Sequence, residues 1–258
     1  MNLREIILNS IGLYSERVSK EEDIKKILKK LLPYKTEYQL IRLGEDGDGG
    51  YLLPNDLNGI KYCFTAGVGH TCEFEKQLLE KYNIISTMID PIINEDVIIP
   101  NKLKFINKKI SGFEEDNAIT INNFIDKSED FILKIDIEGQ EYENLIAISE
   151  DKLSKARILI IEFHHLRELR SNFFNNLFNK IINKILQNFI VCHTHVNNGG
   201  KVKYLKSIKV PDIIEMTFIN KRRVKSEINE FAEIPHFLDK KILKDKPDIY
   251  IDKSWYDF

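Results

Sequence analysis

The sequence predicts an α/β protein built on a mostly parallel sheet with helices on both faces. From residue 61 to residue 220, short apolar runs alternate with segments of helical periodicity. Residues 131–137 and 156–163 are almost continuously apolar, which is typical of strands buried on both faces of a parallel sheet. A chain of 258 residues is long enough for one large domain with a substantial core.

The segment before the sheet combines helices with a glycine-rich stretch. Residues 1–35 predict two short amphipathic helices, the second capped by Ser19 and ended by Pro33. The apolar face of this second helix comprises Ile24, Ile27, Leu28, Leu31 and Leu32. Residues 42–54 contain four glycines, so we expect a shaped loop there and no regular element.

The sheet is expected to begin at residue 61. We predict strands at residues 61–65, 84–89, 104–110, 131–137, 156–163, 189–195 and 212–220. We predict helices at residues 72–82, 121–125, 142–149 and 173–188. Thr120 is the expected N-cap of the second of these helices. The predicted organisation is a helical lead-in over residues 1–40, a sheet domain over residues 41–222 and a wrapping tail over residues 223–258.

Composition restricts the classes of function. Lys and Arg total 38 against 40 Asp and Glu, so a net charge of −2 offers no overall field for nucleic acid or an anionic membrane. No apolar run approaches the roughly 20 residues of a membrane span. Three cysteines without a C-x-x-C pair favour a reducing, cytoplasmic setting. We expect a small-molecule partner and no nucleic acid, and we leave a homo-oligomer open.

A local basic group follows the last predicted strand. It comprises Arg222, Arg223 and Lys225. We interpret it as a solvent-exposed run of charge, with phosphate binding as the alternative.

A glycine turn and an acidic residue indicate an adenosine-containing cofactor. Gly67 and Gly69 join a predicted strand to a helix, where backbone amides and the helix N-terminus can approach a ligand closely. Asp90 ends the next predicted strand, 21 residues after Gly69, and an acid there can accept both hydroxyls of a ribose. The alternative is a tight turn beside a solvated aspartate.

The residues after the turn favour S-adenosylmethionine over a nicotinamide dinucleotide. A dinucleotide fingerprint places a third small residue where this chain has Cys72. Glu73 and Glu75 follow, and carboxylates are unfavourable beside a pyrophosphate but compatible with a sulfonium and an amino group. An NAD(P)-dependent oxidoreductase stays the alternative.

Acids and histidines gather at the ends of the later strands. Asp136 and Glu138 lie at the carboxyl end of the fourth predicted strand, and the pair His164 and His165 follows the fifth. Such groups can take the proton from an alcohol as it is methylated. They can also hold a divalent metal, which makes a metal-dependent hydrolase a further alternative, or they can simply hydrogen-bond within a polar cleft. We assign no metal ligands from the sequence.

Residues 135–139, Ile-Asp-Ile-Glu-Gly, resemble the signature strand of the FkbM family of S-adenosylmethionine-dependent O-methyltransferases. Further motifs that resemble this family follow at residues 42–54, 67–75, 162–165, 193–198 and 212–217. The resemblance covers residues 40–220. It implies a class I methyltransferase (Rossmann-like) fold, a seven-stranded and mostly parallel sheet whose last strand is reversed.

The resemblance also implies an acceptor, namely a sugar hydroxyl on a nucleotide-activated sugar or on a precursor of a capsular or other surface polysaccharide. Together with the residue patterns, it assigns cofactor contacts to Asp48, Tyr51, Gly67, Gly69, His70, Glu75, Asp90, Ser111, Gly112 and Asp136. The catalytic candidates are His165 and His195, which lead as the base, with Asp136 and Glu138. The acceptor contacts are His164, His193, Asn197, Asn198 and Glu215. Tyr51 is expected to shield the bound cofactor from water.

Overall fold

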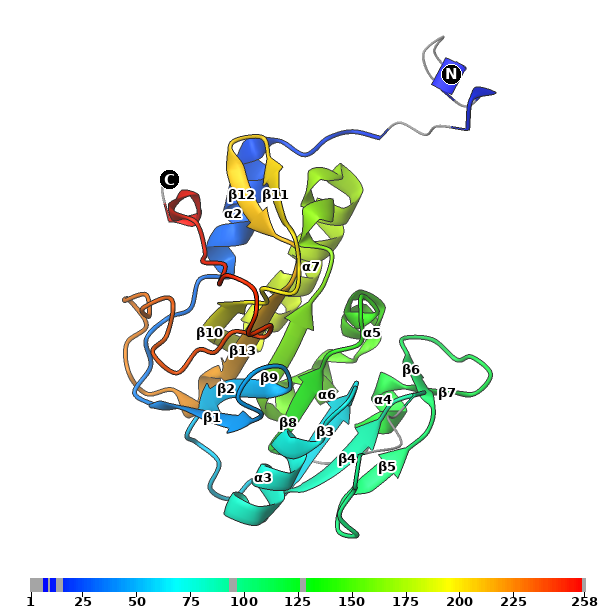
Figure 1. Cartoon of the computed structure of the whole chain (residues 1–258), viewed down its shortest axis with the longest axis vertical. Helices are drawn as coiled ribbons and strands as arrows, with labels where there is room; N and C mark the ends of the chain where they lie inside the picture. Colours follow the sequence, from blue (N-terminus) through cyan, green and yellow to red (C-terminus); the bar gives the residue numbers. More distant parts are fainter. Residues whose placement is uncertain (1–6, 9, 13–15, 93–96, 126–128, 257–258) are drawn as a thin grey trace.

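The predicted fold class is confirmed by the arrangement of the central sheet. The computed structural model describes residues 7–8, 10–12, 16–92, 97–125 and 129–256 (Figure 1). Within these residues, a seven-stranded sheet has the order β10-β13-β9-β8-β3-β4-β5. Its strands are β3 (Tyr62–Ala66), β4 (Ile85–Ile89), β5 (Lys104–Ile106), β8 (Phe131–Ile135), β9 (Ala156–Phe163), β10 (Phe189–Val196) and β13 (Ile214–Asn220).

The reversed strand is the last in the chain and lies inside the sheet. Strand β13 runs antiparallel to β9 and to β10, whereas the pairs β3–β4, β3–β8, β4–β5 and β8–β9 are parallel. The carboxyl ends of β3, β4, β8 and β9 therefore meet at one edge, where ligands bind in open α/β sheets.

Helices cover both faces of the sheet, but unequally (Figure 1). One face packs against α2 (Glu21–Lys30), α4 (Ile121–Phe124), α5 (Glu141–Ala147), α6 (Glu150–Lys155) and α7 (Asn172–Asn188). The opposite face packs against α3 (Glu73–Tyr82) and a hairpin of β1 (Leu40–Gly44) and β2 (Gly50–Pro54). The predicted apolar face of α2 is buried in the hydrophobic core on the first of these faces. Full burial of each such side chain contributes about 1.5–3 kcal/mol to the free energy of folding.

The prediction of an irregular loop over residues 42–54 is wrong, because that segment forms most of the hairpin β1–β2. The glycines lie at the ends of the two strands and in the turn, where Gly44 and Gly49 take positive φ angles of 95° and 78°. After the glycines, Tyr51 and Leu53 of β2 pack into the hydrophobic core between the hairpin, α3 and the sheet. The hairpin is thus held by burial of side chains that flank the glycines.

Several further elements differ from the predictions. The strand expected at 104–110 ends at Ile106, where the chain turns and Lys108 N donates to Ile106 O. The remaining residues belong to a separate strand, β6 (Lys109–Ser111), which pairs with β7 (Ala118–Thr120). The structure also contains α6 and the hairpin of β11 (Val202–Leu205) and β12 (Ile208–Pro211), none of which the sequence pattern predicted.

The two cap predictions have different outcomes. Lys20, not Ser19, is the N-cap of α2, and the buried Ser19 donates its backbone N–H to Arg170 O at 2.8 Å. Thr120 is confirmed as a cap, since its hydroxyl accepts a hydrogen bond from Asn123 N. The first helix predicted within residues 1–35 lies partly outside the described residues.

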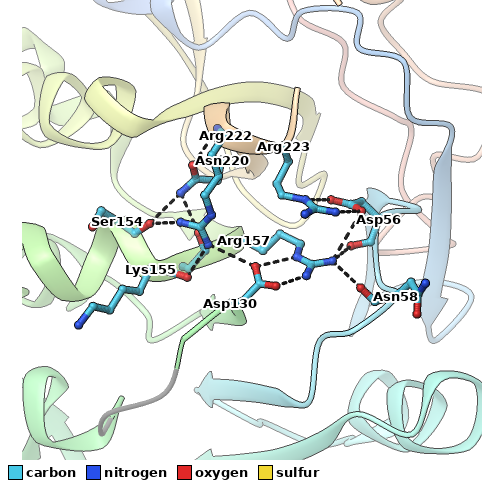
Figure 2. A network of polar contacts seen from close by, with 10 residues as sticks. Asp56, Asn58, Asp130, Ser154, Lys155, Arg157, Asn220, Arg222 and Arg223 are labelled. Atoms are coloured by element: carbon cyan, nitrogen blue, oxygen red, sulfur yellow. Dashed lines mark hydrogen bonds and ion pairs between the residues drawn. The ribbon is translucent and has the colours of Figure 1, made fainter. Parts of the chain in front are cut away.

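A buried arginine network closes the opposite, amino-terminal edge of the sheet (Figure 2). Arg157, at the start of β9, is 3% exposed and donates to Asp130 Oδ1 at 2.8 Å and to the carbonyls of Asp56 and Asn58 at 3.0 and 2.8 Å. Arg223 donates to both carboxylate oxygens of Asp56, at 2.7 and 2.8 Å. Figure 2 shows Arg157 between the two aspartates, so it joins the β2–β3 connection to the start of β8.

The basic group after the last strand belongs to this network. Arg222 bonds to Lys155 O at 2.8 Å and to Asp130 at 3.3 Å, and Asn220 at the end of β13 bonds to Ser154 O (Figure 2). Arg222 is exposed, as the interpretation of a solvent-exposed run expects, and Arg223 is half-buried, but both side chains also bond to residues that flank the strands.

The C-terminal segment contacts elements that are far away in the sequence. Phe231 stacks near Tyr34 with ring centroids 4.8 Å apart, and the buried Trp255 donates its indole N–H to Lys209 O at 3.0 Å. Figure 1 shows the red end of the chain beside α2 and the β11–β12 hairpin. Among the described residues, no helix combines the length and the apolar character needed to cross a bilayer.

Candidate functional site

A cavity of about 520 Å³ lies at the carboxyl edge of the sheet. Its wall is formed by the ends of β3, β4, β8 and β9, by the turn of the β1–β2 hairpin and by Ile242 and Leu243 of the C-terminal segment. The predicted site residues that line it are Asp48, Tyr51, Gly67, Gly69, His70, Glu75, Asp90, Asp136, Glu138, His164 and Asn197. The position is the one at which open α/β sheets bind ligands.

The two glycines of the turn differ in how strictly the backbone requires them. Gly67 has a φ of +87°, and a Cβ there would lie 1.6 Å from Asp136 O. Gly69 has a φ of +63°, and a Cβ there would meet nothing within 4 Å. Gly67 is therefore needed for close packing of β3 against β8, whereas Gly69 faces open space in the cavity.

Asp90 lies beside the glycine turn, as predicted. Its Oδ2 accepts hydrogen bonds from Val68 N at 2.8 Å and Gly69 N at 3.2 Å, and its Oδ1 accepts one from Ile92 N at 2.9 Å. The carboxylate is thereby fixed at the cavity wall. An acid in this position can hold the hydroxyl groups of a ribose.

Lys134 is a cavity residue that the sequence analysis missed. It is 4% exposed, and its Nζ donates to Gly67 O at 3.1 Å and lies 3.9 Å from Glu75 Oε1. Thr65 donates to the same Glu75 oxygen at 2.7 Å. A lone lysine within the apolar run 131–135 is the signal that could have identified this buried pair of opposite charges.

The β1–β2 hairpin closes one side of the cavity. The phenol of the buried Tyr51 donates to Asp136 Oδ2 at 2.9 Å, and its ring lies 4.8 Å from Lys134 Nζ. Burial, reinforced by the nearby Asp136 carboxylate, raises the pKa of Tyr51 well above its ordinary value. At the turn, Asp48 lies 3.8 Å from His70, and both side chains are exposed.

A wall of carboxylates with one histidine lies at the ends of β8 and β9, beside the glycine turn. Asp136, Glu138 and His164 each offer a ligand atom within 4.8 Å of the others. Glu162, at the end of β9, accepts a hydrogen bond from Asn197 Nδ2 at 2.6 Å. Burial, followed by the negative charge of Asp136, raises the pKa of Glu162 well above its ordinary value. Glu162 belongs to the motif 162–165, but the sequence analysis gave it no role.

The orientation of His164 is fixed by Glu141, which the sequence analysis also missed. Nδ1 of His164 lies 2.8 Å from Glu141 Oε1, an oxygen that also accepts from Ile137 N at 3.3 Å and Gly139 N at 3.1 Å. Burial opposes protonation of the imidazole, but this hydrogen bond with the Glu141 charge outweighs it and raises the pKa of His164. Because the Glu141 carboxylate can only accept a hydrogen bond, we assign a proton to Nδ1 of His164. The other ring nitrogen, Nε2, lies 3.4 Å from Glu138 Oε2 and 3.5 Å from Glu162 Oε2.

The two leading candidates for the base do not line the cavity. His165 is exposed, and its ring lies against Gly139, where a Cβ would meet it at 3.0 Å. His195 is buried, with Nδ1 3.6 Å from Glu215 and with Nε2 lacking a hydrogen-bond partner among the described residues. Their catalytic role stays a prediction from the sequence.

Other predicted site residues also lie outside the cavity wall. His193 bonds to Asp239 at 2.8 Å, and Asn198 donates to Leu243 O at 2.9 Å, so both hold the C-terminal segment. Ser111 donates to Glu115 at 2.9 Å, and Gly112 N donates to Glu143 at 3.3 Å. The cavity is lined instead by the two residues just before this pair, Lys109 and Ile110.

Comparisons with known proteins identify one family and two solved structures to which the chain is similar. The family model of the methyltransferase FkbM domain matches residues 54–191, which is more than half of the chain. The crystal structure of the 23S rRNA methyltransferase ErmE is similar at a TM-score of 0.35 and 11% identity, covering 82% of this chain and 72% of that chain. The N-methyltransferase NodS from Bradyrhizobium japonicum WM9 is similar at a TM-score of 0.32 and 10% identity, covering 62% and 86%.

A search of curated proteins found no match. The identification therefore depends on the family model, whose matched region contains the glycine turn, Asp90, Asp136 and His164. This match shows that the chain belongs to the FkbM methyltransferase domain family.

Proposed function

We propose that the protein transfers the methyl group of S-adenosylmethionine to a hydroxyl group of a sugar. The observation that carries this proposal is a single cavity that runs from the glycine turn and Asp90 to the wall of Asp136, Glu162 and His164. A volume of about 520 Å³ is within the usual range for ligand pockets, and one end suits a nucleoside while the other suits a hydroxylic acceptor.

The donor is assigned to the glycine-turn end of the cavity. Asp90 would hold the ribose, with Lys109 and Ile110 near the adenine. The buried pair Lys134 and Glu75 lies beneath the turn, with nitrogen and oxygen 3.9 Å apart. Such a pair offers a cation for the carboxylate of the methionine part and a carboxylate for its amino group. NAD would bring a pyrophosphate to the same Glu75, which is the less favourable arrangement.

The acceptor is assigned to the carboxylate wall. Methyl transfer breaks the S–CH₃ bond as the O–CH₃ bond forms in line, so the hydroxyl oxygen must be held opposite the sulfur. The hydroxyl proton passes to a carboxylate of the wall, and S-adenosylhomocysteine leaves. The amide of Asn197 and the oxygens of Asp136 and Glu162 supply the mixed donors and acceptors that sugar hydroxyls require.

The resemblance to the FkbM family supports a sugar as the acceptor, and we place the reaction in the cytoplasm. Sugars there are activated as nucleotide derivatives, so a nucleotide-activated sugar is the acceptor to test first. Incubation of the full chain with S-adenosylmethionine and a panel of nucleotide sugars should produce S-adenosylhomocysteine and a sugar heavier by one methyl group, detected by mass spectrometry.

Calorimetry distinguishes the proposal from an oxidoreductase or a hydrolase. S-adenosylhomocysteine should bind with one site per chain, and Asp90→Ala should weaken it by about tenfold, the loss expected for hydrogen bonds to a charged group. The matched control is Asp116→Ala, at an exposed aspartate outside the cavity wall. Binding of NAD without binding of S-adenosylhomocysteine would overturn the proposal, as would hydrolysis that requires no methyl donor.

A further inference from the structure

We propose that Asp136, Glu138 and His164 bind a divalent metal ion in the wall of the cavity. Their ligand atoms, one carboxylate oxygen from each acid and one imidazole nitrogen, all lie within 4.8 Å of one another. Two ligands on opposite sides of an ion at about 2.1 Å are about 4.2 Å apart, so the group needs only a small contraction to surround one.

Two of the three residues are held in place, and the third is free to move toward them. Asp136 and His164 directly follow β8 and β9, and His164 is buried, so these two are fixed by the sheet. The Glu138 side chain is 88% exposed and free to move inward. Ion binding would therefore reposition Glu138 and leave the sheet unchanged.

The hydrogen bond of His164 points independently to a ligand at its other nitrogen. Imidazoles that ligate metals usually donate the remaining ring N–H to a carboxylate or a carbonyl. Nδ1 of His164 meets the Glu141 carboxylate at 2.8 Å, and Glu141 is itself buried and held by the N–H groups of Ile137 and Gly139. Nε2 makes no hydrogen bond with any described residue and faces acids at 3.4 and 3.5 Å.

The wall also concentrates acidic groups that a cation would stabilise. Asp136, Glu138 and Glu162 surround one histidine, and the ion pairs among the described residues bring no lysine or arginine to any of them. Lys134, the buried cation of this cavity, bonds to Gly67 O and pairs with Glu75. A divalent ion would compensate the wall directly.

Two carboxylates and one imidazole suit Mn²⁺, which accepts both oxygen and nitrogen ligands. Three protein ligands leave further positions of the ion open toward the cavity, for water or for oxygens of the acceptor. This role rests on the proposed function, because an acceptor hydroxyl bound there would be held in place and would ionise more readily.

Manganese itself is the probe for the test. We expect the full chain, stripped with chelator, to bind one Mn²⁺, measured by electron paramagnetic resonance of the free ion and by calorimetry. Glu138→Gln and His164→Gln should each weaken binding at least tenfold. The matched controls are Glu168→Gln and His236→Gln, which lie outside the cavity wall and should bind as the wild type does. Circular dichroism melting establishes that each variant is folded.

Two results would overturn the metal site. These are the absence of saturable Mn²⁺ binding and equal binding by Glu138→Gln, His164→Gln and the wild type. S-adenosylhomocysteine binding and methyl transfer are measured on the same samples in chelator. If both persist without metal binding, the metal proposal fails and the proposed function stands. If Mn²⁺ binds with the expected variant dependence but S-adenosylhomocysteine does not, the proposed function fails and the metal site stands.

Discussion

The phenol of Tyr51 donates a 2.9 Å hydrogen bond to Oδ2 of Asp136. This bond joins strand β2 of the hairpin to the residue just after β8, and both residues line the cavity. Because the two side chains come from different elements, the bond ties the position of the hairpin to that of the carboxylate. The bond also occupies one of the two oxygens of the Asp136 carboxylate.

Removal of the Tyr51 hydroxyl should slow methyl transfer while the protein stays folded. Tyr51→Phe keeps the ring that packs on Phe74 at 5.5 Å but leaves Asp136 without its partner. A hydrogen bond to a charged group contributes about 1.5–3 kcal/mol, so we expect a fall in kcat of about tenfold or more. Steady-state kinetics measure the fall, and an unchanged kcat would show that the bond does not position Asp136.

The geometry of the cavity and the sequence prediction differ over two adjacent histidines. His164 lines the cavity, whereas His165 is exposed and lies against Gly139. We expect His164→Ala to lower kcat/KM far more than His165→Ala does, by about 100-fold, because loss of a side chain from the cavity wall misplaces the acceptor hydroxyl. A larger loss for His165→Ala would instead support the base predicted from the sequence.

The arginine network should contribute strongly to stability. Arg157→Met removes a buried cation and deprives Asp130, whose pKa is lowered mainly by the Arg157 hydrogen bond, of its main partner. Loss of one partner of a buried pair costs about 3–5 kcal/mol, measured as the free energy of unfolding in urea. Arg222→Gln, at a more exposed position of the same network, is the control and should cost less. Equal losses would contradict the assignment of Arg157 as the central residue.

The contact between His193 and Asp239 should make the stability depend on pH. Burial would raise the pKa of Asp239, but the hydrogen bond with His193 outweighs it and holds that pKa below its ordinary value. A carboxyl group with a lowered folded-state pKa stabilises the fold above its unfolded pKa of about 3.9 and loses this contribution as the pH falls below that value.

Asp239→Asn therefore should unfold more easily than the wild type at pH 6, by about 1–2 kcal/mol. This difference should shrink as the pH falls below about 4. Chemical denaturation at several pH values measures it. A difference that stays constant down to pH 3 would show that the Asp239 charge does not hold the C-terminal segment.

The periodicity of the sequence predicted the main strands and helices well because burial on both faces leaves a local pattern. The continuous apolar run of β8 and the helical spacing in α2 and α7 are of this kind. The hairpin β1–β2 was missed because its glycines dominate the local pattern, while its strands are stabilised by packing against α3 and the sheet. Burial against distant elements leaves no signal in a short window of sequence.

For the cavity, the sequence by itself predicted the glycine turn, Asp90 and Asp136, which line it, and determined the family, because strand ends and motifs are local features. Only the tertiary structure decided which of two adjacent histidines faces the cavity and that Lys134, Glu141 and Glu162 belong with it. The physical reason is that side-chain direction after a strand depends on the backbone turn and on long-range partners. The positive φ of 60° at His165 turns the chain away just after His164 has been fixed by Glu141, and no spacing in the sequence records that turn.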